Sequence, residues 1–547
     1  MSENGRNFSP PEPILFQEGG YKIYRAHQEV SGWTLTAMCI LMTKARKPLL
    51  DREACYAAMK ARDVRFDGRF FCGVSTTGIY CRPVCRVKLP KEENCTFFIT
   101  AAAAEAAGYR PCLRCRPELA PGLAPVDSVS RLAGSASQAM EEDCIAPCRI
   151  SELAASLGIT NRHLHRVFLA EYGVSPVQYL QTRRLLLAKN LLTDTMLSMS
   201  DVAMAAGFGS IRRFNDLFLK RYRLAPGMLR KKAWNASENK SDVITLSLEY
   251  RPPYAWDHLI SFLAARAIPG VESVVADAYR RTVAVKKGET IHYGWIAVAN
   301  RPNRNALSVT MATSLLPVLS QVLAKTRLLF DVNCCPDKVY EKLAVMNEFS
   351  EGVCVPGIRM PGCFDPFEMS VRAVLGQQIT VKAARTLAMR LAKGMGDNVD
   401  TPFEELAFAF PHPDKICSLD GAIENHLGGL GITGSRARSI LALAQAMANH
   451  SIIFSLGANP ADVMDKLSKL PGFGPWTVQY VTMRALGWPD AFPHTDYGVR
   501  KALSGRTEKE ILTISQKWSP WRSYATVLLW NFLANETRTS KQRHPNK

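Results

Sequence analysis

The chain has no apolar run long enough to cross a membrane, and its first residues lack the ordering of a signal peptide. Acidic residues are scarce: 49 Asp and Glu stand against 68 Lys and Arg, which leaves a formal net charge of +19. The 15 cysteines are an odd number in a chain of 547 residues, so a disulfide framework is not expected. These features favour a protein of the reducing cytoplasm that binds nucleic acid, with an anionic membrane surface as the weaker alternative.

No single hydrophobic core can organise 547 residues, so three or four domains are expected. With 47% hydrophobic and 21% charged residues, the composition is that of ordinary globular domains. Turn-rich, polar stretches at 119–125 and 235–241 predict linkers. Residues 1–41 are expected to form a poorly ordered extension, and Met42 is an alternative start of translation.

Four cysteines form two close pairs, Cys81-x3-Cys85 and Cys112-x2-Cys115. Two such pairs separated by a loop suit one tetrahedral zinc ion with four thiolate ligands. Arginines crowd both pairs, which favours a site that lies against phosphate; a purely structural zinc is the alternative. The spacing does not tell which of the four sulfurs would react.

The sequence around these pairs resembles the N-terminal domain of the Ada methyltransferase family. The match covers residues 50 to 120, including Thr-Thr-Gly-Ile-Tyr-Cys-Arg-Pro-Val-Cys-Arg at 76–86 and Gly-Tyr-Arg-Pro-Cys at 108–112. The resemblance implies that all four cysteines bind Zn²⁺ and that Cys81 takes a methyl group from a DNA methylphosphotriester. Zinc keeps a sulfur as the nucleophilic thiolate, so this chemistry is reasonable. The side chains expected to contact DNA here are Thr77, Arg86, Arg110 and Arg114.

Methylation of one zinc-bound thiolate changes the formal charge of the site from about −2 to about −1. We therefore expect the methylated domain to bind DNA phosphate more tightly and to activate transcription. The Pro-Cys-His-Arg-Val site that Ada proteins carry at their C-terminus is absent, so no transfer from O6-methylguanine is expected.

Two stretches have the helix-turn-helix pattern. A helix at 150–159 ends at a glycine turn and leads into a second helix near Asn161, and the pattern recurs from 201 to 220, with a second helix near Ser210. One copy alone could be a helical hairpin. Two copies joined by a long helix at 177–192 resemble the AraC-type DNA-binding domain. The resemblance implies that the recognition helices present to DNA the residues Asn161, Arg162, His163, Ser210, Arg212 and Arg213, although a solvated basic face is the alternative for each.

Alternating runs between 243 and 310 predict strands, and residues 317–534 read as mostly helical. Leu-Pro-Gly-Phe-Gly at 470–474 predicts a helix-hairpin-helix, because Gly472 and Gly474 let backbone N–H groups approach a DNA phosphate. Asp496 follows this hairpin and precedes an aromatic residue, where an aspartate is usually only a helix cap.

Residues 243 to 535 are similar to the 3-methyladenine DNA glycosylase II (AlkA) family, with matches that include Tyr-Arg-Pro-Pro-Tyr-Ala-Trp at 250–256 and Trp-Arg-Ser-Tyr-Ala at 521–525. The resemblance implies that Asp496 is the catalytic carboxylate and that a flipped, cationic base enters an aromatic pocket. That pocket is expected to consist of Trp476, Tyr480 and Trp530, for which ordinary core packing is the alternative. Gln378 stands where the family inserts a leucine wedge into the gap left by the base.

Two further absences narrow the chemistry that this resemblance implies. Trp476 occupies the position of the Schiff-base lysine of bifunctional glycosylases, so no strand-cleaving lyase is expected. No cysteine follows Cys417, which excludes the terminal iron–sulfur cluster of related glycosylases.

We therefore expect a multidomain protein with a small α+β four-cysteine zinc domain (42–120), an all-α tandem helix-turn-helix domain (126–234), an α+β module (243–325) plus an all-α helix-hairpin-helix glycosylase domain (326–535), and a basic tail (536–547). The expected function is methyl transfer that switches on repair genes, joined to excision of alkylated bases. The competing hypothesis is a non-enzymatic, zinc-dependent transcription factor with a glycosylase-like DNA-binding fold. Expected partners are duplex DNA and RNA polymerase, in the cytoplasm of a bacterium, at the nucleoid.

Overall fold

The computed structural model describes residues 17–18, 21–22, 51–122, 131–143, 150–233, 243–455 and 458–543. The chain divides into two units, Met1–Asp51 and Arg52–Lys547. In the first unit, strands β1 (Gln17–Glu18) and β2 (Tyr21–Lys22) pair antiparallel. The expectation for residues 1–41 otherwise lies outside the described residues, as does all of the linker at 235–241. None of the described helices is long and apolar enough to span a membrane.

The four-cysteine segment is a small α+β fold around a four-stranded sheet with the order β5-β3-β4-β6. Its elements are α1 (Arg52–Ala61), η2 (Val64–Phe66), β3 (Phe71–Val74), β4 (Ile79–Cys81), η3 (Glu92–Asn94), β5 (Cys95–Phe98), α2 (Ala101–Ala106), β6 (Arg110–Pro111) and η4 (Pro117–Leu119). β4 and β6 run parallel, whereas the other pairs are antiparallel. The parallel pair brings the two cysteine pairs together.

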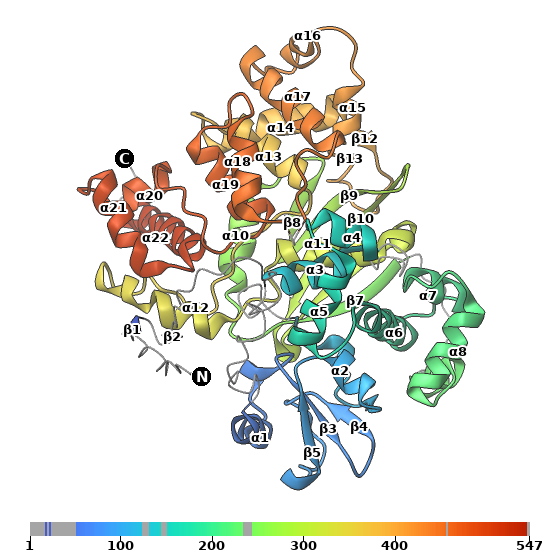
Figure 1. Cartoon of the computed structure of the whole chain (residues 1–547). Coiled ribbons are helices and arrows are strands. Elements are labelled where there is room, and N and C mark those ends of the chain that lie inside the picture. Colours follow the sequence, from blue (N-terminus) through green and yellow to red (C-terminus); the bar gives the residue numbers. More distant parts are fainter. Residues whose placement is uncertain are drawn as a thin grey trace, which may run out of the picture. The chain divides into compact units, whose positions relative to one another are not determined.

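In the next segment the described residues form helices and the turns between them, and they contain both expected helix-turn-helix units (Figure 1). Its helices are α3 (Arg131–Asp143), α4 (Ile150–Ser156), α5 (Asn161–Tyr172), α6 (Pro176–Asp194), α7 (Met199–Ala205), α8 (Ile211–Tyr222) and α9 (Pro226–Ala233). Each second helix begins where the sequence predicts: the hydroxyl of Thr160 caps α5, and that of Ser210 caps α8. Gly158 and Gly207, at φ +69° and +83°, allow the left-handed turns between the paired helices.

The α+β module that follows is a five-stranded antiparallel sheet of order β7-β11-β10-β9-β8 with one helix before β8. Its elements are β7 (Val243–Glu249), α10 (Trp256–Arg266), β8 (Glu272–Val275), β9 (Ala278–Lys287), β10 (Thr290–Arg301), η7 (Pro302–Arg304) and β11 (Ala306–Ala312). Alternate residues of β7 are buried, as the period of a one-sided strand requires. These residues share one core with α6 to α9, so the second helix-turn-helix packs on this module.

The described rest of the chain is mostly helical, with one short pair of strands. Its elements are η8 (Thr313–Val318), α11 (Leu319–Leu329), α12 (Pro336–Leu343), η9 (Ala344–Glu348), α13 (Pro366–Leu375), α14 (Val381–Met395), β12 (Asp397–Asn398), β13 (Phe408–Ala409), α15 (Pro413–Cys417), α16 (Ile423–Gly428), α17 (Gly434–Ala448), α18 (Pro460–Ser468), α19 (Pro475–Ala485), α20 (Tyr497–Ala502), α21 (Glu508–Ser515), η10 (Gln516–Trp518) and α22 (Arg522–Arg543).

Buried residues of η8 and α11 belong to the core of the α+β module, and the later helices pack around two further cores. Figure 1 shows helices α13 to α19 as an upper group and α20 to α22 as a red group. α19 contributes to both of the further cores, with Val478 and Val481 in one core and Met483 in the other. The region where the two cores meet α10 holds the cleft described below. The expected fold class is confirmed, whereas the proposed domain limits stay predictions.

Candidate functional site

The four cysteines come together because β4 pairs with β6 in parallel. Tyr80 lies opposite Pro111, and the N–H of Cys112 donates to the carbonyl of Tyr80 over 3.0 Å. Cys81, the last residue of β4, and Cys112, which directly follows β6, therefore lie at the same end of the two strands. A tight turn, in which the N–H of Cys85 donates to the carbonyl of Arg82 over 3.1 Å, returns the second sulfur of the first pair to the same point.

All four Sγ atoms lie within 4.8 Å of one another. Tetrahedral zinc with Zn–S bonds of about 2.3 Å separates its sulfurs by about 3.8 Å, so the cluster fits the ion with a small contraction. Cys81, Cys85 and Cys112 are buried, and Cys115 is half-buried. The expected ligand set is confirmed.

Arg82, directly after Cys81, helps to hold the four cysteines in position. Its backbone N–H donates to the Sγ of Cys115 over 3.4 Å, and its guanidinium donates to the carbonyl of Cys115 over 3.0 Å. The same guanidinium forms ion pairs with Asp67 and with Glu249 of β7, and Arg82 is only 4% exposed. The guanidinium of Arg82 is therefore occupied within the protein, and no sequence motif indicates this role.

The four side chains expected to contact DNA at this centre are all exposed. Thr77 lies in the turn between β3 and β4, and Arg86, Arg110 and Arg114 surround the cysteines on the surface. Among the described residues, none of these three arginines has an acidic partner. Their charge is therefore available to a phosphate, although DNA contact by them stays a prediction.

Asp496 lies at the edge of a cleft with a volume of about 1290 Å³. It caps α20, where its Oδ1 accepts from the N–H groups of Gly498 and Val499 at 2.8 and 3.2 Å. The same carboxylate accepts from two indoles, from Trp530 Nε1 at 2.8 Å and from Trp476 Nε1 at 2.9 Å. The helix cap and the candidate catalytic group are thus one carboxylate, held by four N–H donors.

Aromatic rings line the cleft beside this carboxylate. Trp476 and Tyr480 are four residues apart on α19, which places them on one helix face, and their rings stack at 5.1 Å with an interplanar angle of 16°. Trp530 of α22 lies 6.2 Å from Tyr480 and stacks on Phe262 of α10 at 5.9 Å. The structure therefore brings together the three predicted pocket residues, and Phe262, which does not itself line the cleft, packs against Trp530.

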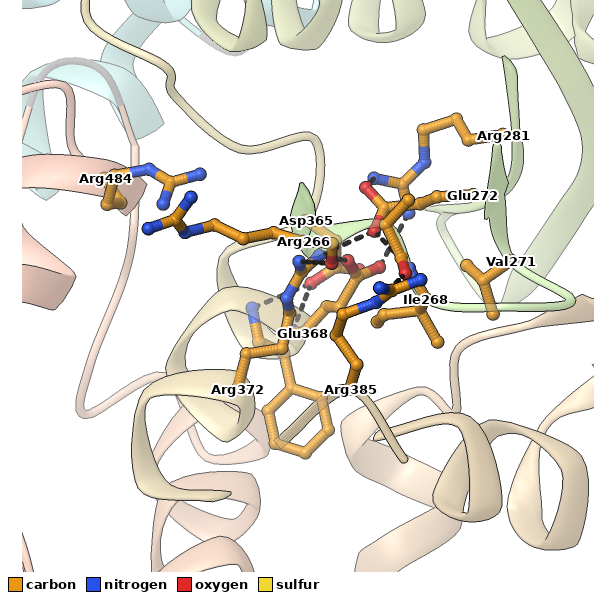
Figure 2. Close-up of polar contacts among 12 residues, drawn as sticks. Arg266, Ile268, Val271, Glu272, Arg281, Asp365, Glu368, Arg372, Arg385 and Arg484 are labelled. Atoms are coloured by element: carbon orange, nitrogen blue, oxygen red, sulfur yellow. Dashed lines mark hydrogen bonds and ion pairs between the residues drawn. The ribbon is translucent and has the colours of Figure 1, made fainter. Parts of the chain in front are cut away.

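Two arginines lie beside these rings without a carboxylate of their own among the described residues. The guanidinium carbon of Arg266 is 3.7 Å from the Phe262 ring centre, and that of Arg484 is 5.0 Å from it. Figure 2 shows the two guanidinium groups directed toward each other. Burial lowers the pKa of Arg266 to about 10. Arg484 donates to the hydroxyl of Tyr480 over 2.8 Å, which fixes that ring.

A buried ionic cluster behind the cleft holds the end of α10 in place (Figure 2). Arg372 of α13 donates to Glu272 over 2.8 Å, to Glu368 over 3.0 Å and to the carbonyl of Arg266 over 2.6 Å. Arg281 of β9 donates to Glu368 over 2.6 Å. Because α10 carries Phe262 and Arg266, this cluster connects the α+β module to the helical part at the cleft.

The hairpin lies at the rim of the same cleft. Gly472 has φ +79°, and Gly474 is the residue before the first turn of α19, so the backbone N–H groups of this turn face outward at a helix N-terminus. Both glycines are exposed, as is Gln378 in the loop between α13 and α14. All three residues line the cleft with Asp496.

The recognition helices present their polar residues as expected. Asn161, Arg162, Ser210, Arg212 and Arg213 are exposed, and only His163 is half-buried. Ser210, Arg212 and Arg213 line a shallow hollow of about 430 Å³. Their contact with DNA stays a prediction.

Four family models match the chain. They are the metal binding domain of Ada (residues 54–118), a helix-turn-helix domain (153–232), the AlkA N-terminal domain (245–365) and the HhH-GPD superfamily base excision DNA repair protein (371–507).

Curated relatives cover the chain as a whole and in parts. The "Probable bifunctional transcriptional activator/DNA repair enzyme AlkA" of Mycobacterium tuberculosis is 36% identical over 88% of this chain and 97% of its own length. "DNA-3-methyladenine glycosylase 2" of Escherichia coli is 34% identical over 52% of this chain and 96% of its own length. "Bifunctional transcriptional activator/DNA repair enzyme Ada" of Escherichia coli is 37% identical over 24% of this chain and 35% of its own length.

These matches define a class of protein in which an Ada-type metal-binding domain and a helix-turn-helix domain precede a base-excision DNA repair fold. The chain belongs to the family of the bifunctional transcriptional activator/DNA repair enzyme AlkA.

Proposed function

We propose that the C-terminal half is a monofunctional DNA glycosylase that excises 3-methyladenine and other alkylated bases. The observation that carries this proposal is the carboxylate of Asp496, oriented by the indoles of Trp476 and Trp530 inside an aromatic cleft beside the hairpin. Capping α20 needs only one oxygen of this carboxylate, whereas its place among the rings of an open cleft suits stabilisation of a developing positive charge. The relative in Escherichia coli that spans this half is named for the same activity.

The residues act in a simple order. The hairpin binds a backbone phosphate, and the damaged nucleotide flips out of the duplex. Its base then binds between the rings of Trp476, Tyr480 and Trp530. An alkylated purine is already a good leaving group, so the bond between C1′ and the base nitrogen breaks with its electron pair going to the base. Asp496 stabilises the positive charge that develops on the sugar, and water then adds at C1′ and loses a proton.

We also propose that Cys81 is the acceptor of a methyl group from a DNA methylphosphotriester. Zinc, when bound by the four cysteines, would keep their sulfurs deprotonated near neutral pH. The Cys81 sulfur attacks the methyl carbon, a C–S bond forms, the C–O bond breaks, and a phosphodiester anion leaves. Arg86, Arg110 and Arg114, which are exposed, would hold that phosphate.

Methyl transfer would then act as the transcriptional switch. Loss of about one unit of negative charge near phosphate, at roughly 6–8 Å and an effective dielectric constant of about 20, is worth about 2–3 kcal/mol before salt screening. The tandem helix-turn-helix would bind promoter DNA about 10 to 100 times more tightly and recruit RNA polymerase. Equal affinities of methylated and unmethylated protein for a promoter duplex at low salt would contradict this mechanism.

One experiment tests both activities together. The protein is incubated with duplex DNA treated with a methylating agent, released bases are identified by chromatography, and the protein is digested for peptide mass spectrometry. We expect free 3-methyladenine and a methyl group on Cys81. If neither product formed, the result would support the competing hypothesis of a zinc-dependent transcription factor with a glycosylase-like fold.

A further inference from the structure

The loop between α13 and α14 places Gln378 at the rim of the cleft in an unusual backbone conformation. Gln378 is exposed and has φ +57°, a left-handed value that residues other than glycine rarely adopt. Such a conformation persists only where the neighbouring structure determines it. The contacts of the preceding residue, Gln377, provide this determination.

Gln377 is tied from two directions. Its backbone carbonyl accepts from the guanidinium of Arg436 on α17 over 2.5 Å. Its side-chain Nε2 donates to the carbonyl of Gly472 over 2.7 Å and to the hydroxyl of Thr477 over 2.9 Å. The residue before Gln378 is therefore fixed by one contact from α17 and by two from the hairpin and α19.

The hairpin is held against α17 as well. A Cβ on Gly472 would lie 2.3 Å from Oγ of Ser439, which is 2% exposed and follows Arg436 by three positions on α17, near the same helix face. α17, the hairpin and the loop before α14 thus form one continuous contact network. A shift of the hairpin when it binds a phosphate would therefore be transmitted through these contacts to Gln378.

We propose that Arg436 is a positioning residue for base flipping, which holds Gln378 in the conformation that enters the duplex, while Gln377 couples that conformation to the phosphate grip of the hairpin. This inference rests on the proposed glycosylase function. It assigns to Arg436 no contact with substrate. The role of Arg436 is to fix the carbonyl before Gln378, and a guanidinium suits this because its planar fork is rigid.

The test compares two DNA duplexes that carry the same alkylated purine, one paired normally and one in a single-nucleotide bulge. Extrusion from the bulge needs little unpairing, so correct placement of Gln378 matters little there. Arg436→Met should lower the single-turnover rate of base release about tenfold on the paired duplex, the rate equivalent of one charge-assisted hydrogen bond. On the bulged duplex the rate should stay within about twofold of the wild type.

Arg438→Met is the matched control, because Arg438 lies on the same helix, is exposed and pairs only with Glu424 at 2.7 Å among the described residues. This variant should leave both rates unchanged. Arg436→Lys should recover part of the loss on the paired duplex. Gln377→Met gives a second, independent break in the same network and should show the same preference for the bulge. Equal losses on both duplexes would show a merely structural effect and overturn the proposal.

A fluorescence measurement separates this proposal from the proposed function. With 2-aminopurine placed next to the damaged base, wild-type protein should raise the emission as the neighbouring stack opens, and Arg436→Met should reduce that rise. If the wild type released no base but the fluorescence contrast remained, the glycosylase function would fail and the positioning role would stand. If base release occurred and the contrast were absent, the positioning role would fail.

Discussion

At the scale of single residues, Asp496 combines a structural and a chemical task, and the two can be separated. Asp496→Asn keeps an oxygen that can accept from Gly498 and Val499, and asparagine is as good a helix cap as aspartate. It removes the negative charge that stabilises the transition state. Release of 3-methyladenine should therefore fall at least about 100-fold, while affinity for duplex DNA stays within a few-fold.

Single-turnover assays and equilibrium binding on the same preparation measure these two quantities for Asp496→Asn. Methyl acceptance should be unchanged, because the cysteines lie in another domain. A normal rate of excision would show that the carboxylate is not the catalytic group.

The four cysteines differ in role although they share one ion. Cys81→Ser should lose methyl acceptance and keep much of the fold, provided that oxygen or water completes the zinc coordination. Cys112→Ser should lower zinc affinity, with only an indirect effect on methylation. Peptide mass spectrometry after exposure to methylated DNA measures the site directly, and a methyl group on Cys85 or Cys115 would exclude Cys81 as the acceptor.

The sequence identified the zinc ligands because their spacing within two short motifs is local. It could not identify the role of Arg82 at this centre, because its partner Glu249 is 167 positions away. Phe262 could not be identified either, because no local sequence pattern shows that a phenylalanine on α10 stacks on Trp530. Residues whose roles depend on contacts between domains are the ones that a single sequence leaves unassigned.

At the scale of elements, Glu105 of α2 joins three parts of the chain. Its buried carboxylate accepts from Tyr80 beside the metal centre at 3.1 Å, from Thr182 of α6 at 3.0 Å and from Tyr222 of α8 at 3.3 Å. Burial raises the pKa of Glu105 to about 7, although these hydroxyls and the charge of Arg221 oppose the rise. The metal domain, the connecting helix α6 and the second helix-turn-helix unit therefore meet at one titratable group.

This pKa predicts a stability that depends on pH. A glutamate whose pKa is raised in the folded state contributes stability that is complete below its unfolded value of 4.5 and is lost as the pH rises through about 7. Over this whole pH range the free energy of unfolding should fall by about 3 kcal/mol. Glu105→Gln keeps an acceptor and stays neutral, so its melting temperature should fall less than that of the wild type between pH 6 and pH 8. Parallel falls in calorimetry would contradict the assignment.

The helix boundaries were the most predictable elements. Thr160 and Ser210 end their turns with side-chain caps, so α5 and α8 begin within one residue of the predicted starts. The junction at Glu105 was not predictable, since a glutamate in an alanine-rich helix looks like a solvated residue. Only packing of α6 and α8 against α2 buries it.

At the scale of the whole molecule, one buried arginine connects the metal domain to the glycosylase half. Arg251, just after β7, is 1% exposed. It donates to the carbonyl of Asp67 over 3.0 Å, to that of Gly122 over 2.8 Å and to that of Asn333 over 3.1 Å. A Cβ on Gly122 would lie 2.9 Å from Oδ1 of Asn333, so the two halves meet here without room for a further side chain.

This close joint indicates that the metal domain and the α+β module form one structural unit rather than two domains on a free linker. Arg251→Met should leave the carbonyls of Asp67, Gly122 and Asn333 without their donor, at a cost of about 2–4 kcal/mol to the joint. Amide hydrogen exchange at 66–69 and 119–122 should therefore accelerate about 30-fold or more. Exchange in the hairpin and base release should not change.

The control is Arg304→Met, since Arg304 is an exposed arginine of the same module, and it should alter neither region. If exchange at 66–69 matched the wild type, the joint would contribute no stability, and the two halves would behave as independent domains.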